Sequence, residues 1–171
     1  MPFVPFAEVK ATTANRRMRR HAGSLIRILE AGWIGDPNLS GVEWIVRRGN
    51  EPPRHQHERE DEAVFVVAGD VEFQVGQRRV EIGQGNWLFL PRGVAHSFRV
   101  LSDQVHMLAM YAPGGIETFF EALSEPVTSE DGAAQAPLQN PFERESAREL
   151  ARQYGLSFAP TWSAVAASAV I

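Results

Sequence analysis

Short runs of alternating apolar and polar residues dominate the chain up to residue 111. Val42, Trp44 and Val46, for example, occupy every second position, as in a strand with one buried face. Glycine, proline and aspartate separate most of the runs, and Gly76-Gln77 has the form of a two-residue hairpin turn. Many short strands joined by tight turns predict an antiparallel all-β sandwich or barrel. The predicted strands are residues 24–30, 42–48, 63–67, 71–75, 78–82, 87–90, 96–101 and 105–111.

Helical spacing replaces this alternation after Pro113. Apolar residues recur every three or four positions at Ile116, Phe119, Phe120 and Leu123, which predicts one short helix. Residues 141–154 begin with proline and are followed by glycine, so they predict a second helix. We therefore expect an N-terminal arm (1–23), a β-barrel (24–112) and C-terminal helices with a tail (113–171). The helices should pack on the outside or the mouth of the barrel.

The basic cluster at residues 15–21 belongs to the expected arm. We interpret it as a solvated arm, or as an edge strand kept soluble by its charge. His21 ends this cluster, and we expect it at the surface.

Composition narrows the classes of protein that fit. The 171 residues are 44% hydrophobic and 22% charged, which is typical of one globular domain. The net charge of −4 gives no reason to expect nucleic acid, and no apolar run approaches the roughly 20 residues that span a membrane. The chain has no cysteine, so a metal site must use histidine and carboxylate. The lack of disulfides and of a signal peptide fits a cytoplasmic protein.

Three histidines and one glutamate within residues 49–100 have the spacing of a metal site. His55 and His57 are two positions apart, so on a strand both point to one face, with Cα atoms about 6.6 Å apart. Glu62 begins the next strand and shares its parity with Val64 and Val66, so its side chain can point inward as theirs are expected to do. His96 begins another strand after a Pro-x-Gly turn. Three imidazoles and a carboxylate suit one divalent transition metal: Fe, Mn, Ni, Co, Cu or Zn. Such a set can leave coordination positions open for catalysis.

Rival carboxylates lie in the same acidic turn. Glu60 shares its parity with Glu62, so either side chain can in principle face the ion. We favour Glu62, because it directly precedes the apolar run over residues 63–67. Glu58, Glu60 and Asp61 are interpreted as solvated charges.

The joint spacing of these residues resembles the two signature motifs of the cupin superfamily. The first motif reads Gly49-x5-His55-x-His57-x4-Glu62-x6-Gly69, and the second reads Gly85-x5-Pro91-x-Gly93-x2-His96. The second motif commonly ends with asparagine four residues after its histidine, where this chain has Val100. The resemblance implies an antiparallel jelly-roll β-barrel, often a homodimer, with a metal held inside by His55, His57, Glu62 and His96.

A finer resemblance concerns the segments after the barrel. Residues 113–120 and 149–158 are similar to the corresponding segments of bacterial single-domain cupins related to quercetin 2,3-dioxygenase. This implies a dioxygenase that cleaves a flavonol-like or other enolisable aromatic substrate with O2, with Glu62 as general base. The alternatives are another metal-dependent cupin enzyme, such as an isomerase or lyase, and a non-catalytic cupin that binds a small molecule. The superfamily includes all of these, because a fold does not fix a function.

Other side chains are candidates for the pocket. Apolar walls are expected from Trp44, Phe65, Phe89, Phe98, Met107 and Met110, depending on strand parity. Arginines that flank the motifs would favour a carboxylated or phosphorylated substrate if they faced the pocket; these are Arg48, Arg54, Arg92 and Arg99. His106 is either an inward acid or base near the metal, or a surface histidine.

Overall fold

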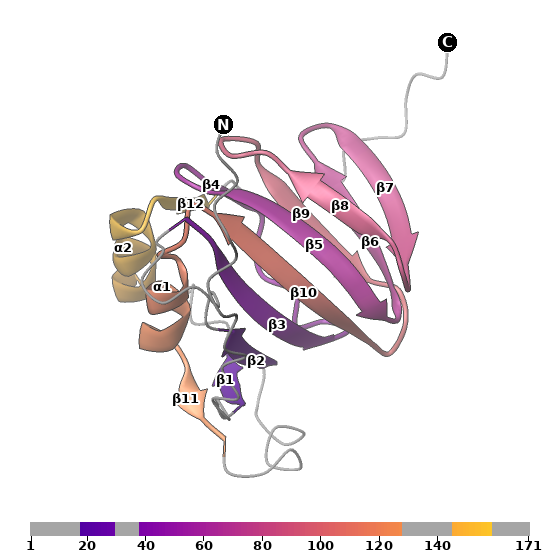
Figure 1. The fold of residues 1–171 in the computed structure, drawn as a ribbon, viewed down its shortest axis with the longest axis horizontal. Helices are drawn as coiled ribbons and strands as arrows, with labels where there is room; N and C mark the ends of the chain where they lie inside the picture. The colour runs from indigo at the N-terminus through magenta and orange to yellow at the C-terminus, as the bar shows by residue number, and fades with distance from the viewer. Residues whose placement is uncertain (1–17, 30–37, 128–144, 159–171) are drawn as a thin grey trace, which may run out of the picture.

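Two antiparallel β-sheets face each other in the computed structural model, which describes residues 18–29, 38–127 and 145–158 (Figure 1). The seven-stranded sheet has the order β11 (Glu125–Pro126), β1 (Arg19–His21), β2 (Ser24–Leu29), β3 (Ser40–Arg47), β10 (Gln104–Ala112), β5 (Asp61–Ala68) and β8 (Trp87–Leu90). The five-stranded sheet has the order β12 (Leu156–Phe158), β4 (His55–His57), β9 (His96–Val100), β6 (Asp70–Val75) and β7 (Arg78–Gly83). The all-β prediction is confirmed, and the arrangement is that of a jelly roll whose two sheets remain separate.

The alternation in the sequence places the strands well. Each predicted strand is present, with ends that differ from the prediction by two residues at most. The predicted hairpin is also present, because Val75 pairs with Arg78 across Gly76-Gln77 and Gly76 has a φ of +58°. A glycine tolerates this left-handed conformation because it lacks a Cβ atom.

His21 corrects the expectation of a surface residue at the end of the basic cluster. β1 pairs with β2 on one side and with β11 on the other, so the described end of the expected arm is part of the sheet, while residues 1–17 lie outside the described residues. The His21 side chain is 3% exposed and packs edge-to-face on Trp44 and Phe120. The two residues before it, Arg19 and Arg20, are charged, and the pairing with β2 sets the strand alternation that turns His21 inward.

The core lies between the two sheets. Along β5, Val64 and Val66 are buried while Phe65 between them is exposed. On the facing sheet, Phe73 is buried and packs against the tilted ring of Phe98, with 5.4 Å between the ring centroids. Burial of these alternate apolar side chains stabilises the packing of the two sheets, with a free energy of about 25 cal/mol per Å² of apolar area buried.

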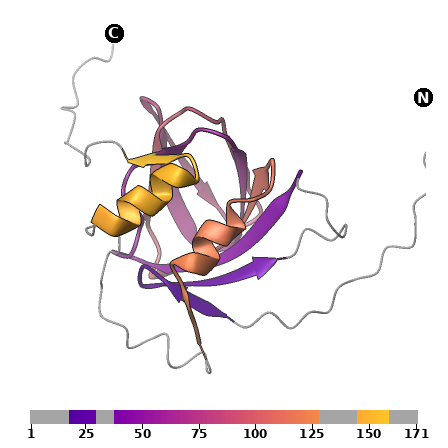
Figure 2. The ribbon, with the colours of Figure 1, turned by 90° about the vertical axis from the view of Figure 1, so that its left-hand side faces the viewer.

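The C-terminal elements cover one end of the barrel, as Figure 2 shows. α1 (Glu117–Ala122) matches the predicted first helix. α2 (Glu145–Gln153) matches the described part of the second; residues 141–144 lie outside the described residues. Gly155 follows α2 with a φ of +76°, and the chain then forms β12, which pairs with β4. The C-terminal segment therefore contacts the strand that carries His55 and His57.

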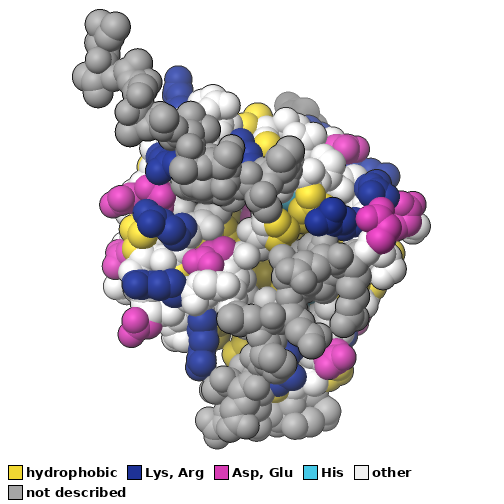
Figure 3. Space-filling view, turned by 180° about the vertical axis from the view of Figure 1, so that it is seen from behind, with side chains coloured by type: hydrophobic (Ala, Val, Ile, Leu, Met, Phe, Trp, Pro, Cys, Tyr) yellow, Lys and Arg dark blue, Asp and Glu magenta, His cyan; other side chains and the backbone are white. Residues whose placement is uncertain are grey.

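The surface seen from behind carries arginine and acidic side chains interspersed with hydrophobic ones (Figure 3). Within the described residues, neither helix has the length and apolar character needed to cross a membrane.

Candidate metal centre

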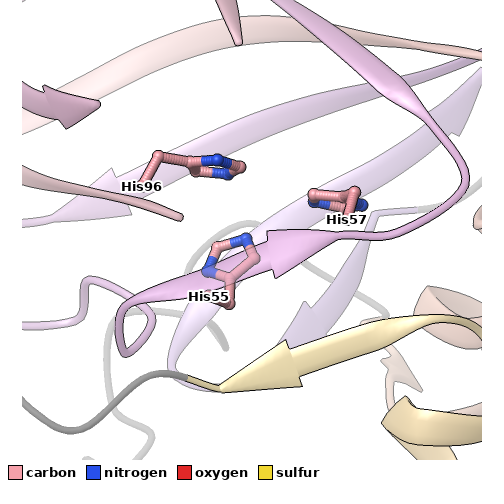
Figure 4. A group of neighbouring side chains, drawn as sticks. All are labelled: His55, His57 and His96. Carbon is pink, nitrogen blue, oxygen red and sulfur yellow. The ribbon is translucent and has the colours of Figure 1, made fainter. Parts of the chain in front are cut away.

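Three histidine side chains converge from two neighbouring strands. His55 and His57 lie on β4, and His96 lies on β9 directly opposite His55 in the strand register. One ring nitrogen from each histidine lies within 4.8 Å of one from each of the others. Figure 4 shows the three rings turned toward a common space. The structure thus brings together the three histidines that the sequence selected.

Backbone carbonyls fix the tautomer of two of these rings. The Nδ1 atom of His55 is 2.8 Å from the carbonyl oxygen of Pro53, and that of His96 is 3.1 Å from the carbonyl oxygen of Val94. A carbonyl oxygen only accepts, so each Nδ1 must donate its hydrogen. The lone pair of a neutral ring is then on Nε2, the atom that remains for a metal.

Glu62 brings a carboxylate to the same cluster from the other sheet. Its Oε2 atom is 3.4 Å from the Nε2 atoms of both His57 and His96. It is paired in register with Tyr111 on β10, whose hydroxyl hydrogen-bonds to the carboxylate. The same hydroxyl also interacts with the Trp44 indole. Glu62 is therefore buried and held by its neighbours on the seven-stranded sheet.

The protonation states of His55 and Glu62 are those that bind cations. Burial, together with the neighbouring imidazoles of His96 and His57, lowers the pKa of His55 to about 3. Burial by itself raises the pKa of Glu62, but the imidazoles of His96, His57 and His55 beside the carboxylate outweigh it and lower that pKa to about 2. At neutral pH His55 is consequently uncharged and Glu62 is ionised. Metal ligands must be deprotonated in this way.

An unsatisfied buried atom shows that these residues fit a metal ion. The Nε2 atom of His96 is buried and has no hydrogen-bond partner among the described residues. A buried polar atom without a partner costs about 1–3 kcal/mol. A cation between the Nε2 atoms and the Glu62 carboxylate would satisfy them together, so the donor set fits one divalent transition metal.

Two contacts join the segments that carry the first and second motifs. The backbone N–H of Gly93 donates to the carbonyl oxygen of His57 at 2.7 Å. The backbone N–H of Arg92 donates to Asp61 at 2.9 Å, and its guanidinium donates to the same carboxylate at 2.6 Å. These hydrogen bonds from Arg92 lower the pKa of Asp61 to about 2. Asp61 is thus half-buried and engaged with the turn before β9, rather than a free solvated charge.

In the acidic turn, the prediction that Glu60 is a solvated charge is wrong. Glu58 is exposed, as expected, but Glu60 is only 4% exposed. Its Oε2 atom is 3.6 Å from the Nδ1 atom of His57. Polarity suggested a solvated side chain, and only the path of the turn between β4 and β5 buries it.

A pocket opens beside the histidines, and its walls are almost entirely apolar and aromatic. It confirms Trp44, Phe98 and Met107 as lining residues. The complete lining is His21, Trp44, Pro52, His55, His57, Glu62, Val64, Phe73, Leu90, His96, Phe98, Met107, Ala109, Tyr111, Phe119, Phe120, Leu156 and Phe158.

Three expected wall residues are on the wrong face. Phe65, Phe89 and Met110 are exposed on the outside of the seven-stranded sheet. Each alternates with residues that point inward, such as Val64 and Leu90, and side chains in a strand alternate between faces. Hydrophobicity alone did not show which residues of these strands point inward, because both faces of the strands carry apolar residues.

The C-terminal elements supply wall residues that sequence reasoning missed. Phe119 and Phe120 come from α1, and Leu156 and Phe158 come from β12. The helical spacing had identified Phe119 and Phe120 as a buried face. Nothing in the sequence indicated that this face closes the pocket, because that depends on where the helix docks.

The arginines that flank the motifs are engaged elsewhere. Arg48 donates to the carbonyl oxygens of Leu101 and Ser102, and Arg54 donates to those of Gly76 and Ala95. Arg92 binds Asp61 and Arg99 binds Glu72. None of the four lines the pocket as the described residues define it.

His106 lies on the outer face of the seven-stranded sheet. Its Nε2 atom is 2.7 Å from a carboxylate oxygen of Glu43 on β3, and its side chain is 29% exposed. Of the two interpretations, the outward one is correct, because Met107 occupies the inward position.

Comparison with known proteins places this geometry in context. The family model described as "Cupin domain" matches residues 42–112, which include all four candidate ligands. The chain is 33% identical over 81 residues to an uncharacterized protein of Streptomyces coelicolor, covering 47% of this chain and 76% of that one. It is 27% identical over 79 residues to quercetin 2,3-dioxygenase of Bacillus subtilis, covering 46% of this chain but 23% of that enzyme. The solved structure of an RmlC-like cupin from Shewanella frigidimarina is similar, with a TM-score of 0.55 and 18% identity, covering 66% of this chain and 96% of that one.

Proposed function

Because this chain belongs to the cupin superfamily, we propose that it is a metal-dependent dioxygenase that cleaves a flavonol-like or other enolisable aromatic compound with O2. The observation that carries the proposal is the pocket: a cluster of histidines and one carboxylate set in apolar, aromatic walls. The similarity to the Bacillus subtilis enzyme also supports the proposal, but it spans only 23% of that protein. The main support is therefore the set of residues at the site.

His55, His57, His96 and Glu62 would hold the metal through three Nε2 atoms and one carboxylate. A divalent transition metal supplies Lewis acidity and a redox partner for dioxygen when it is bound. The protein's own contribution is a rigid donor set, since two rings are anchored by carbonyls and Glu62 is held by Tyr111.

The walls of the pocket favour a neutral aromatic substrate. Its polar groups are the four candidate ligands with His21, Trp44 and Tyr111, and neither arginine nor lysine lines it in the described part of the chain. A carboxylated or phosphorylated substrate would therefore lack a side-chain cation, which proteins normally supply to bind such groups. Aromatic rings gain instead from contacts with Phe98 and Phe120 on the walls.

Glu62 would also act on the substrate's proton. It is ionised at neutral pH and lies at the pocket wall, so a substrate hydroxyl beside the metal can transfer its proton to this carboxylate. Burial and the charge of Glu62 raise the pKa of Tyr111 well above its usual value, so its hydroxyl stays protonated and remains a donor to Glu62. The apolar walls exclude water from this transfer.

The test is oxygen uptake by the metal-loaded protein. Apoprotein is loaded separately with Mn, Ni, Co or Fe(II), and oxygen consumption is followed after addition of quercetin. Luteolin, which has the same ring system without the 3-hydroxyl, is the matched control compound. We expect uptake with quercetin and none with luteolin. Absence of uptake with every metal overturns the flavonol proposal, and a bound compound that is never turned over would instead support a binding module.

A further inference from the structure

Glu60 is a buried carboxylate that the catalytic proposal does not use. It sits in the turn between β4 and β5, with its Oε2 atom 3.6 Å from the Nδ1 atom of His57. Both of these atoms are buried, and neither has a hydrogen-bond partner among the described residues. Two unsatisfied polar atoms that face each other at this distance need only a small shift to form a hydrogen bond.

The three histidines differ in what holds their Nδ1 atoms. His55 and His96 donate to neutral backbone carbonyls, of Pro53 and Val94 respectively. The Nδ1 atom of His57 instead faces the charged carboxylate of Glu60. Hydrogen bonds to ionised acceptors are about twice as strong as those between neutral groups. The His57 ring therefore has a different electronic environment from the other two.

We propose that Glu60 is a positioning residue for the metal site: it accepts the Nδ1 hydrogen of His57, orients the ring so that Nε2 faces the ion, and increases the electron donation of that nitrogen. Carboxylates that bind the far nitrogen of a metal-bound histidine have this effect in metalloproteins generally. The inference rests on the proposed metal site, and it assigns Glu60 and Glu62 different tasks on opposite sides of the same ring.

The surroundings of Glu60 explain why a structural role alone does not account for it. Arg92 is close enough for the charge of Glu60 to affect it, but its guanidinium is already bound to Asp61 at 2.6 Å. A buried carboxylate that is not paired with a cation destabilises the folded apoprotein. The charge of Glu60 becomes stabilising once a cation binds to the other nitrogen of His57. The ring then carries positive charge between the ion and the carboxylate.

The experiment compares Glu60→Gln with Glu58→Gln, a matched change in the same turn at an exposed side chain. Affinity for Co(II) and Zn(II) is measured by competition with a chelator, and the visible spectrum of the Co(II) protein is recorded. Glu60→Gln should weaken metal affinity about 10–100-fold and shift the Co(II) spectrum, because the amide oxygen is a weaker acceptor than the carboxylate. Glu58→Gln should change neither.

Thermal unfolding of the apoproteins separates positioning from a structural role. A positioning role predicts that Glu60→Gln leaves the apoprotein Tm unchanged or raised, while the increase in Tm on adding metal becomes smaller. Equal metal affinity in wild type and Glu60→Gln overturns the inference and leaves the proposed function intact, as does a loss of apoprotein Tm large enough to explain the weaker binding. Failure of the wild type itself to bind metal overturns the metal site and the inference together.

Discussion

The two faces of the seven-stranded sheet carry the same residue types in different settings. On the outer face, Glu43 lies 2.7 Å from His106 and 3.2 Å from Arg27. On the inner face, Glu62 lies 3.4 Å from both His57 and His96. The outer contacts are shorter and include a permanent cation, so that cluster is complete without a further ligand.

The inner cluster is incomplete in a way that the outer one is not. It places the Glu62 carboxylate among several buried imidazoles, and the Nε2 atom of His96 has no hydrogen-bond partner among the described residues. Water satisfies polar atoms at an exposed surface, but it does so poorly inside an apolar pocket. A histidine–glutamate contact is therefore weak evidence for a metal site unless burial leaves lone pairs that only a cation can use.

The aromatic residues repeat this contrast. Phe73 on the inside is 1% exposed, whereas Phe89 on the outside is 49% exposed. Phenylalanine thus contributes to the core and the pocket on the inner side and is half exposed to solvent on the outer face.

Removal of one inner histidine should have the largest effect. His57→Ala should lose most of its bound metal, with an affinity lowered about a thousandfold, since loss of a ligand costs more than the 10–100-fold expected for its outer partners. Metal content after purification, measured by mass spectrometry, checks this. His106→Ala on the outer face is the control and should retain the wild-type content. Unchanged metal in His57→Ala would refute the ligand assignment.

The next largest effect concerns the two phenylalanines. Phe73→Ala should lower the free energy of unfolding by about 3–5 kcal/mol, because it removes buried area and leaves a cavity. Phe89→Ala should change it by less than about 1 kcal/mol, because that ring is largely exposed already. Urea unfolding of both metal-free variants measures the difference. Similar losses in the two variants would show that the outer face is covered by something in solution.

A smaller effect is expected from the buried histidine on β1. Burial lowers the pKa of His21 to about 4, although the hydrogen bond with Leu123 opposes this. Between pH 6.5 and 4 the unfolded chain binds a proton at this residue and the folded chain does not. Stability therefore falls as the pH drops through that window, by roughly 2–3 kcal/mol at pH 4.5.

His21→Gln tests this contribution, because glutamine keeps a donor for Leu123 and does not titrate. The loss of unfolding free energy between pH 7 and pH 4.5 should be smaller in His21→Gln than in the wild type, measured on metal-free protein. The other titrating residues are common to both proteins and cancel in the comparison. His106→Gln is the matched control, and parallel losses in wild type and His21→Gln would show that His21 does not titrate in this window.

Much of the fold was predictable because local signals agreed with the tertiary structure. Alternation located the strands, Gly76-Gln77 marked a hairpin, and the spacing of Ile116, Phe119 and Phe120 located α1. β12 was missed, since a three-residue strand has little pattern of its own and exists because it pairs with β4.

The sequence by itself determined the three histidines, the preferred glutamate and the kind of sheet that brings them together, because spacing of two on a strand fixes a common face. The tertiary structure decided what surrounds them: the inward turn of His21, the burial of Glu60, the outward faces of Phe65 and Phe89, and the covering by α1 and β12. These depend on which elements pack across the barrel mouth and on how a turn runs between strands. Contacts between residues distant in the chain determine both the packing of these elements and the path of the turn. A local pattern of hydrophobicity does not predict such contacts.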